Sequence, residues 1–432
     1  MPPEKTLRRH ALSIFRAALR AANPEHAVEA ALALLPLNRY RRIFVVGAGK
    51  ASAAMAHAAE SVLGARITAG SINTKDGHLA RLRRIELNES SHPVPDQRGV
   101  DGARRIAAIA SSAAQDDLVI CLISGGASAL LPLPAAPITL SQKQQTTRLL
   151  LACGATIHEL NAVRKHLSAI KGGQLARLAA PATVLSLLLS DVVGDPLDVI
   201  GSGPTAPDSS TFQTAWDVVC KYALQSKLPP AVRSHLQSGL AGGIPDTPKS
   251  GDPCFRRTAN RIVGSNRIAV DACAARAKAL GYRPMVLSTT IEGETRDVAA
   301  MHAAIAREVV ASRRPARPPL CLISGGETTV TIKGNGLGGR NQEFALAAAL
   351  ALEGVPGVLV FSAGTDGTDG PTPAAGAMAD GATVARAAAL NLPAAAFLAR
   401  NDSYRLFAPL GDLVTTGPTG TNVMDIRLLL IR

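Results

Sequence analysis

One six-residue sequence, Cys-Leu-Ile-Ser-Gly-Gly, occurs twice in this chain of 432 residues, at residues 121–126 and 321–326. In both places it ends a short, continuous apolar run. An apolar run that is stopped by glycine is typical of a buried parallel strand, and α/β sheets bind ligands at the carboxyl ends of their strands. The repeat therefore predicts two α/β regions, each with a loop of small residues. The alternative is two ordinary turns that need glycine only for their backbone angles.

Composition limits the classes of partner. The net charge is +13, but lysine and arginine are spread along the chain and aromatic residues make up only 3%, so neither a basic nucleic-acid surface nor base stacking is indicated. The six cysteines form no CxxC motif, which is typical of reduced thiols. Residues 1–23 lack a signal-peptide core, and the apolar run at residues 183–189 is too short to span a bilayer. We expect a cytoplasmic protein without a nucleic-acid or membrane partner.

A strand, a glycine-rich turn and a helix are predicted at about residues 42–63. The turn reads Gly-Ala-Gly-Lys-Ala-Ser at residues 47–52, and the N-terminus of the next helix can bind an anion. Ser52 replaces the third glycine of a dinucleotide fingerprint, and Ala51 replaces the Ser or Thr of a Walker A loop. What remains is Lys50 at a helix start, a position that the helix dipole disfavours. We interpret Lys50 as functional, with an exposed helix-start lysine as the alternative.

The middle of the chain offers a second set of candidates. A helical pattern covers about residues 141–179, and its Asn161, Arg164 and Lys165 suit either an anionic ligand or a solvated face. Paired glycines at residues 172–173 predict a bend or a close backbone approach, because glycine weakens a helix. Asp191 directly follows a predicted buried strand, a position that suits metal binding or proton transfer. A turn-capping aspartate is the alternative reading.

The C-terminal part holds a denser set of polar residues. Arg340 stands in a glycine-rich loop at a predicted helix start, where a guanidinium can bind phosphate or carboxylate. Asp366 and Asp369 lie on a glycine loop after another strand and could hold Mg²⁺ together with phosphate oxygens. Cations on glycine loops and aspartates at strand ends suit phosphoryl transfer, because that reaction depends on positioning and charge neutralisation.

Six blocks, in their order and spacing, resemble the class II glycerate 2-kinases. The blocks are residues 46–52, 124–128, 190–195, 201–205, 338–343 and 364–370. The resemblance covers almost the whole chain and implies two α/β domains with a cleft between them. It implies a larger, Rossmann-like, three-layer N-terminal domain at residues 1–245. The smaller C-terminal α/β domain, at residues 250–432, contains the family's MOFRL region at about 319–430, and a Gly- and Pro-rich linker at residues 239–252 separates the two.

The same resemblance implies a cytoplasmic enzyme that uses ATP and Mg²⁺ to phosphorylate D-glycerate at its 2-hydroxyl, giving 2-phosphoglycerate and ADP. The family's essential lysine and arginine match Lys50 and Arg340, and we add Asp191 to this catalytic set. Asp366 and Asp369 are the expected metal ligands. The residues expected to bind substrate or nucleotide are Gly47, Gly49, Ser52, Ser124, Gly125, Gly126, Ser128, Ser324, Gly325, Gly326, Glu327 and Asn341.

Two other functions stay open at this point. Some relatives carry the label hydroxypyruvate reductase, although the incomplete dinucleotide fingerprint argues against NAD(P)H-dependent reduction. A noncatalytic protein that binds small anions is the third class. The sequence leaves open which domain binds ATP and which oligomeric state the protein adopts, with a homodimer as one option.

Overall fold

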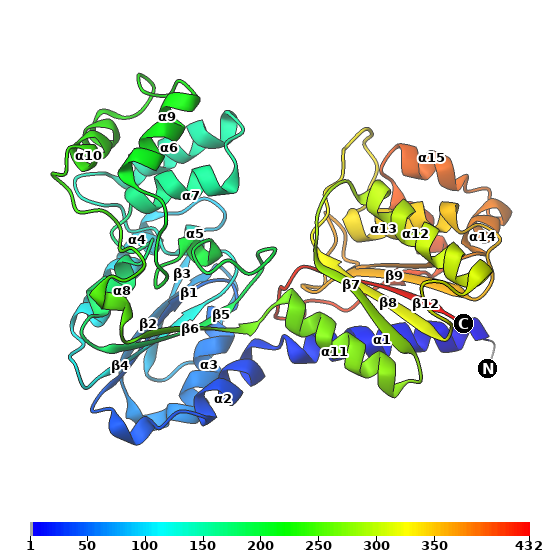
Figure 1. Cartoon of the computed structure of the whole chain (residues 1–432), viewed down its shortest axis with the longest axis horizontal. Coiled ribbons are helices and arrows are strands. Elements are labelled where there is room, and N and C mark those ends of the chain that lie inside the picture. Colours follow the sequence, from blue (N-terminus) through cyan, green and yellow to red (C-terminus); the bar gives the residue numbers. More distant parts are fainter. Residues whose placement is uncertain (1–2) are drawn as a thin grey trace. The chain divides into compact units, whose positions relative to one another are not determined.

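The computed structural model describes residues 3–432 and divides into two compact units (Figure 1). The first, here called the parallel-sheet unit, comprises Pro24–Ser190 and Asp195–Val263. The second, the mixed-sheet unit, comprises Met1–Asn23, Asp191–Gly194 and Gly264–Arg432. Each unit is built on one six-stranded sheet with helices on its faces, which confirms the predicted α/β fold class.

The parallel-sheet unit has the strand order β3-β2-β1-β4-β5-β6. Parallel pairing joins β3 to β2, β2 to β1, β1 to β4 and β4 to β5. The chain order reverses between β1 and β4, and Rossmann-like sheets bind ligands at the strand ends beside such a reversal. The strands are β1 (Ile43–Ala48), β2 (Ile67–Lys75), β3 (Ile85–Ser90), β4 (Leu118–Ile123), β5 (Thr183–Leu189) and β6 (Thr258–Gly264).

Helices cover both faces of this sheet, and a further helical layer lies over one of them (Figure 1). The helices nearest the sheet are α2 (Pro24–Ala33) and α3 (Ser52–Leu63) on one face, and α4 (Gln97–Ser111), α5 (Ala127–Leu130) and α8 (Gln174–Ala179) on the other. The further layer is α6 (Leu140–Ala152), α7 (Ile157–His166), α9 (Phe212–Lys221) and α10 (Pro230–Leu240), with its own apolar core. The 3-10 turns are η1 (Leu37–Arg39), η2 (Gly64–Arg66), η3 (Ile200–Ser202) and η4 (Pro253–Phe255).

The long helical pattern at residues 141–179 forms three helices rather than one. Gly154 adopts a left-handed φ of 74° after α6, and a capping box between Thr156 and Glu159 starts α7. The predicted bend at the paired glycines is confirmed, because Gly172 and Gly173 adopt φ values of 55° and 79° before α8. These breaks give Lys171 a place in a turn rather than on a helix face.

The mixed-sheet unit has the strand order β11-β10-β9-β12-β8-β7. Strand β12 runs antiparallel to both β8 and β9, so the carboxyl ends of those two strands flank its first residue, Asp425. The strands are β7 (Arg283–Ile291), β8 (Leu320–Gly326), β9 (Val358–Gly364), β10 (Gly376–Asp380), β11 (Leu413–Val414) and β12 (Asp425–Ile431). Residues 329–333 form no strand, and the described chain has only a single bridge there, between Thr329 and Glu294.

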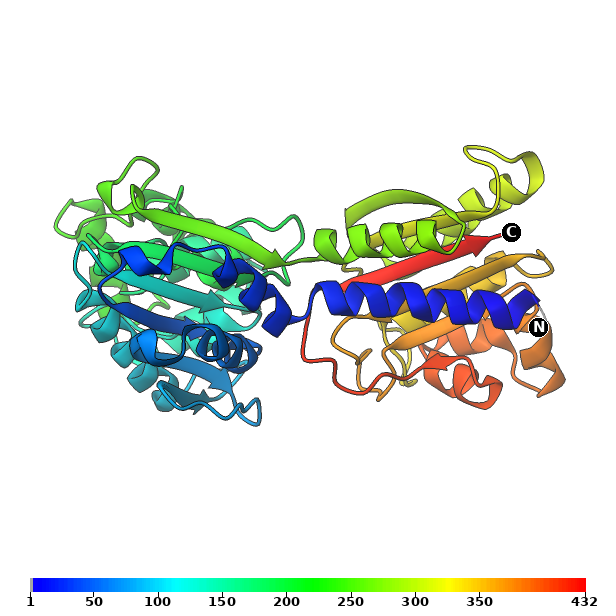
Figure 2. The same cartoon turned by 90° about the horizontal axis from the view of Figure 1, so that it is seen from below.

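Two helices lie side by side along β12 on one face of this sheet, as Figure 2 shows, and the other helices cover the opposite face. The pair is α1 (Pro3–Ala21) and α11 (Asn266–Ala279). The opposite layer is α12 (Thr295–Ser312), α13 (Arg340–Ala351), α14 (Thr383–Ala389), α15 (Ala394–Ala399) and α16 (Ser403–Leu410). None of the described helices is long and apolar enough to cross a membrane.

The chain passes between the units at positions that differ from the sequence-based domains. Residues 1–245 were assigned to the N-terminal domain, whereas α1 packs in the mixed-sheet unit, where Arg8 forms ion pairs with Asp380 and Asp412. The parallel-sheet unit continues to Val263, because β6 completes its sheet. A glycine-rich composition marks a loop, but it does not reveal whether that loop packs within one unit.

Candidate active site

The Lys50 turn and the first Ser-Gly-Gly turn interlock at the carboxyl ends of β1 and β4. The Lys50 amide donates to the Gly125 carbonyl at 2.9 Å, and the Ala51 amide donates to Ser124 Oγ at 3.0 Å. Gly49 has a φ of 141°, and a Cβ atom there would lie 2.1 Å from Ser124 Oγ. Only glycine fits this approach, so the structure brings together two loops that the sequence analysis selected separately.

The side chain of Lys50 is partly exposed beside Gly126 and His92. A Cβ atom on Gly126 would lie 3.3 Å from Lys50 Cγ and 3.1 Å from His92 Nε2. Burial, together with the charges of Lys50, Lys75 and His78, lowers the pKa of His92 to about 4. His92 is therefore neutral at pH 7, and Lys50 supplies the charge of this loop.

Other predicted residues of this loop hold its shape. Ser52 is fully buried, and its Oγ lies 2.7 Å from the Gly49 carbonyl and 2.8 Å from the Asn73 carbonyl. Gly47 faces the Leu122 carbonyl of β4 so closely that a Cβ atom there would lie 2.2 Å from it. These contacts fix the path of the backbone on which Lys50 is presented.

Three cationic side chains gather behind the Ser-Gly-Gly turn. Lys143 of α6 and Lys171 are only 7% and 1% exposed, and Arg164 of α7 is half-buried. Burial, together with the positive charge of Arg164, lowers the pKa of Lys143 to about 7. Burial, with the charges of Lys143 and Arg164, holds the pKa of Lys171 well below its usual range. Among the described residues no carboxylate pairs with any of the three.

A chain of polar contacts links this cationic cluster to the helix that follows the Ser-Gly-Gly turn. Lys171 Nζ donates to the Gly201 carbonyl at 3.3 Å. The next residue, Ser202, donates to Asn161 Oδ1 at 3.1 Å, and its hydroxyl lies 2.8 Å from that of Ser128. Ser128 is thus joined through Ser202 to the residues beside the cationic cluster, and its role in binding stays a prediction.

The mixed-sheet unit presents Arg340 at the start of α13, paired with acids. Arg340 Nε and Nη2 donate to the two carboxylate oxygens of Asp425 at 2.7 and 3.0 Å, and Nη1 lies 2.7 Å from Glu327 Oε1. Asp425 and Arg427 are fully buried and 3.2 Å apart. This is a bidentate ion pair with a second guanidinium behind it, so the charge of Arg340 is compensated within its own unit.

Asp369 and Asn341, two predicted site residues, form the base of this arrangement. Asp369 Oδ1 accepts from the Asn341 amide at 3.0 Å, and Oδ2 accepts from the Gln342 amide at 2.8 Å. Burial raises the pKa of Asp369 to about 6, against the lowering effect of these hydrogen bonds. Asn341 Nδ2 donates to Asp425 Oδ1 at 2.9 Å. Asp369 therefore caps the first turn of α13, which fixes the position of Arg340.

The remaining acids of this region influence one another. Burial raises the pKa of Glu327, the negative charges of Asp425, Asp191 and Asp366 raise it further, and Arg340 opposes them. The structure thus brings Asp191 and Asp366 into the electrostatic range of Glu327. Across residues 3–432 no three His, Cys, Asp or Glu side chains are arranged as a metal-ion site.

The second Ser-Gly-Gly sequence does not form a turn. Ser324–Gly326 are the last residues of β8 and pair with β12. Ser324 is buried, and its Oγ lies 2.9 Å from Nε2 of His302 on α12. A Cβ atom on Gly325 would lie 1.7 Å from Asn266 Oδ1. Glu327, the next residue, is the first of this segment to reach the charged cluster.

Two charged residues near these loops, Asp425 and Lys143, were not identified by the sequence analysis. Asp425 is the first residue of an apolar strand, and only its charge distinguished it from a core position. Lys143 lies in a polar helical segment, where lysine normally faces solvent. No local signal identifies either residue, because their contacts come from distant parts of the chain.

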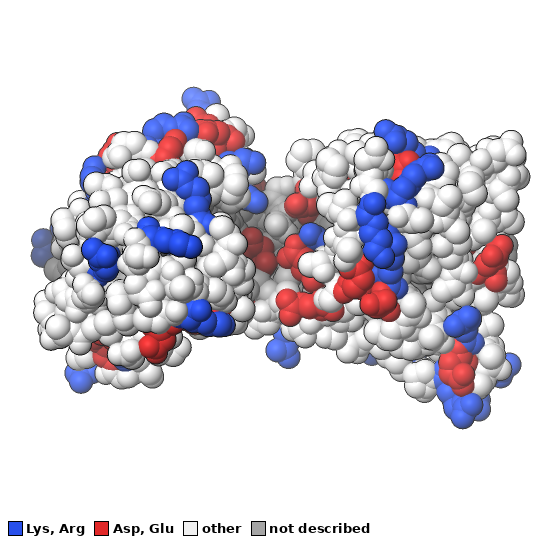
Figure 3. All heavy atoms as spheres, turned by 90° about the horizontal axis from the view of Figure 1, so that it is seen from above, with Lys and Arg blue, Asp and Glu red and all other residues white. Residues whose placement is uncertain are grey.

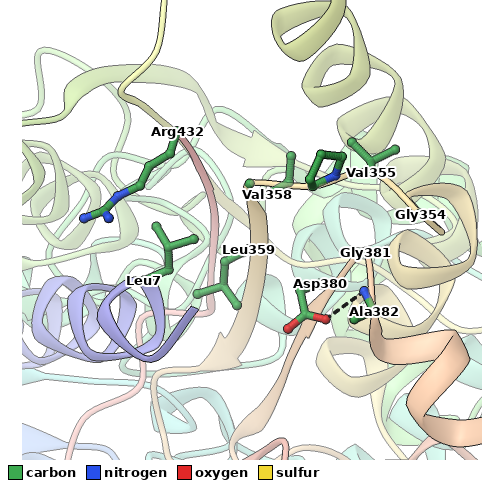
Figure 4. Close-up of a pocket in the computed structure, with 11 residues that line it drawn as sticks. Leu7, Gly354, Val355, Val358, Leu359, Asp380, Gly381, Ala382 and Arg432 are labelled. Carbon is green, nitrogen blue, oxygen red and sulfur yellow. Dashed lines mark hydrogen bonds between the residues drawn. The ribbon is translucent and has the colours of Figure 1, made fainter. Parts of the chain in front are cut away.

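Two surface features lie outside this set of residues. An apolar pocket of about 450 Å³ lies at the other end of the mixed sheet, lined by Leu7, Leu359, Asp380 and Arg432 among others (Figure 4). None of the predicted site residues lines it. On the face drawn in Figure 3, basic side chains are interleaved with acidic ones and with wide uncharged areas, so the excess positive charge forms no continuous surface there.

The fold and the charged loops define a two-unit α/β protein with candidate ligand-binding residues at strand ends in both sheets. Residues 10–237 match a family described as Domain of unknown function (DUF4147), and residues 320–425 match the MOFRL family. The chain is 41% identical to the D-glycerate 2-kinase of Thermotoga maritima over 99% of both chains. The crystal structure of a glycerate kinase from Thermotoga maritima superimposes with a TM-score of 0.92 at 40% identity, covering 99% of this chain and 100% of that one.

A further relative carries another name. A protein of Agrobacterium vitis, provisionally named a hydroxypyruvate reductase, is 45% identical over 90% of this chain and 99% of its own length. The chain belongs to the family of glycerate kinases that combine a DUF4147 domain with a MOFRL domain.

Proposed function

We propose that this protein is a D-glycerate 2-kinase that transfers the γ-phosphoryl group of ATP to the 2-hydroxyl of D-glycerate, giving 2-phosphoglycerate and ADP. The observation that carries the proposal is the full-length similarity to a D-glycerate 2-kinase, at 41% identity over 99% of both chains. The charged loops agree with it, because a phosphoryl-transfer enzyme needs positioned cations more than covalent chemistry.

Lys50 and Arg340 are the proposed catalytic cations. Lys50 stands on a turn held by Gly125 and Ser124, and Arg340 is held by Asp425 and Glu327. The backbone of Lys50 and the guanidinium of Arg340 are thus held in place before a ligand arrives, and a charge that is positioned in advance stabilises a transition state efficiently. The glycines and serines of the loops, together with Asn341, are proposed to shape the backbone against the ligands.

Asp191 and Glu327 are the proposed proton-handling residues. Burial raises the pKa of Glu327, and neighbouring acids, including Asp191, raise it further. A carboxylate with a raised pKa is a better base for a substrate hydroxyl than an ordinary one. We retain Asp191 as the catalytic candidate, with Glu327 as its neighbour in the same acidic group.

Mg²⁺ is part of the proposal, and the oxygen donors of this region suit it. Asp366 is partly exposed, and its Oδ1 accepts a hydrogen bond from the Thr368 amide at 3.0 Å. Asp369 is the weaker candidate, because both of its oxygens accept amide hydrogen bonds that start α13. Magnesium usually takes one or two protein carboxylates and completes its shell with phosphate oxygens and water. Bound at Asp366 and its acidic neighbours, it would neutralise phosphate charge.

One pair of assays tests this function. The protein is incubated with D-glycerate, ATP and Mg²⁺, and separately with hydroxypyruvate and NADH, while ADP formation and NADH oxidation are followed. We expect ADP to form only when glycerate is present, and phosphorus NMR to identify 2-phosphoglycerate. NADH oxidation without ATP-dependent loss of glycerate would instead establish the reductase. The final residue of β2, Lys75, argues against the reductase, because dinucleotide-binding folds carry an acid for the ribose in this region.

A further inference from the structure

The parallel-sheet unit contains three basic side chains that none of its own carboxylates balances. Lys143 is 7% exposed, and its Nζ has no hydrogen-bond partner in the described part of the chain. Lys171 is 1% exposed, and its Nζ has one neutral acceptor, the Gly201 carbonyl. Arg164 lies close enough to affect both ammonium groups. A buried cation without a partner is strongly unfavourable, so such a cluster requires an explanation.

A neighbouring lysine shows how this fold balances a charge when the role is structural. Lys165, next to Arg164 on α7, is 3% exposed, and its Nζ lies 3.1 Å from both Asp198 and Asp208. Asp208 is itself almost fully buried. The fold therefore supplies two carboxylates to one buried lysine and none to the cationic cluster beside it.

Polar groups beside the cluster complete a setting for an anion. Ser202 links Asn161 to Ser128 through contacts of 3.1 and 2.8 Å, and the carbonyl of the preceding residue, Gly201, accepts the hydrogen bond from Lys171 Nζ. A Cβ atom on Gly201 would lie 3.2 Å from Ala127 Cβ, so this turn packs against the residue after Ser-Gly-Gly. The cluster thus lies next to a ligand-binding edge of a Rossmann-like sheet.

We propose that Lys143, Arg164 and Lys171 form a binding site for an oxyanion group of the substrates, which is either the hydroxy-acid carboxylate or a nucleotide phosphate. Both groups offer several acceptor oxygens to ammonium and guanidinium donors. The bound oxyanion supplies the negative charge that the protein withholds from these three residues. The choice of these two candidate oxyanions, the hydroxy-acid carboxylate and the nucleotide phosphate, rests on the proposed kinase function. The inference that an anion binds at this cluster does not rest on it.

The test uses the full-length protein and three single variants. Lys143→Met and Lys171→Met remove one charge each with little change of side-chain length. Arg148→Met is the matched control, because Arg148 is an exposed cation on α6, the same helix as Lys143. Calorimetric titration with D-glycerate, ATP and inorganic phosphate measures binding, and steady-state kinetics measure the KM for each substrate.

We expect the two lysine variants to weaken anion binding roughly tenfold or more, as loss of a charged hydrogen bond does, and Arg148→Met to leave it unchanged. A higher KM for glycerate alone assigns the site to the carboxylate, and a higher KM for ATP alone assigns it to a phosphate. Unchanged binding in both lysine variants would overturn the proposal. If Lys171→Met fails to fold by circular dichroism, Lys143→Met decides the result.

Failure of the two proposals can be told apart. A protein without kinase activity that binds glycerate or phosphate, and loses this binding in the lysine variants, keeps the anion site and loses the kinase. If the protein is an active kinase and its affinities for the three probes are the same in the wild type and in both lysine variants, the kinase proposal stands and the anion-site proposal is refuted. A wild type that binds none of the three probes contradicts the anion site as well.

Discussion

The same six residues end two strands in two different ways. Ser124–Gly126 leave β4 and form a turn, in which Gly126 has a φ of 82° and α5 begins. Ser324–Gly326 continue β8, because β12 extends beside them and pairs Asp425 with Gly326. Identical sequence therefore gives a turn where the neighbouring strands stop and a strand where a neighbour continues. The sheet around the sequence decides which structure forms.

The charged side chains near these two segments also differ, because one set lacks acidic partners and the other has them. In the parallel-sheet unit, Lys143 and Lys171 are buried and Arg164 is half-buried, and no acid pairs with them. In the mixed-sheet unit, Arg340 is paired with Asp425 and Glu327 before any ligand binds. The first set is completed only by a ligand, and the second is organised by the protein itself. We infer that the first set contributes binding and the second contributes a fixed charge for catalysis.

The largest effect is expected from the proposed catalytic cations. Lys50→Ala and Arg340→Ala should each lower kcat by about 100- to 1,000-fold, because a fixed charge at the transition state is lost. Arg340→Lys keeps the charge but loses the bidentate contact with Asp425, so it should restore only part of the activity. Near-normal turnover of either alanine variant, measured by ADP formation, would remove that residue from the mechanism.

The two aspartates of the C-terminal glycine loop should separate stability from catalysis. Asp369→Ala removes the acceptor of the Asn341 and Gln342 amides and should lower the free energy of unfolding by about 1–3 kcal/mol, measured by urea denaturation. Asp366→Ala is the matched comparison, because its carboxylate is partly exposed. We expect it to change stability by less than about 1 kcal/mol and to raise the Mg²⁺ concentration needed for activity. If Asp366→Ala instead lowered stability and Asp369→Ala raised the Mg²⁺ requirement, the structural and metal-binding roles of the two residues would be exchanged.

A smaller effect is expected from pH. Burial and the charge of Arg164 lower the pKa of Lys143 to about 7, while Arg164 and Lys143 also face Lys171. A bound anion favours the charged lysine and raises its pKa, so binding should take up protons and weaken as pH rises from 7 to 9. Titration calorimetry at pH 8 in two buffers of different ionisation enthalpy measures this uptake. Equal uptake by the wild type and Lys143→Met would contradict it.

The sequence predicts those structural parts of the candidate site that local patterns encode. The Lys50 turn and the Arg340 loop follow from glycines at strand and helix ends, and the two apolar strands follow from their composition. Asp425 was not predicted, because it begins an apolar strand and acquires its role only when β12 passes between β8 and β9. Lys143 was not predicted either, since a lysine in a polar helix normally faces solvent.

The boundary between the units shows the same limit. The sequence of residues 3–21 has the pattern of an amphipathic helix, but this pattern does not reveal that the helix packs against α11. Strand β6 likewise joins the parallel-sheet unit through pairing with a distant strand. Long-range packing, rather than local propensity, set each of these outcomes.

The contrast between the two charge sets is tested most directly by two melting temperatures, measured without ligand. Lys143→Met removes a buried, uncompensated charge, so its melting temperature should exceed that of the wild type. Asp425→Asn leaves Arg340 and Arg427 without their buried carboxylate, and its melting temperature should fall, by an amount equivalent to about 3–5 kcal/mol. A lower melting temperature for Lys143→Met, or an unchanged one for Asp425→Asn, would contradict the account.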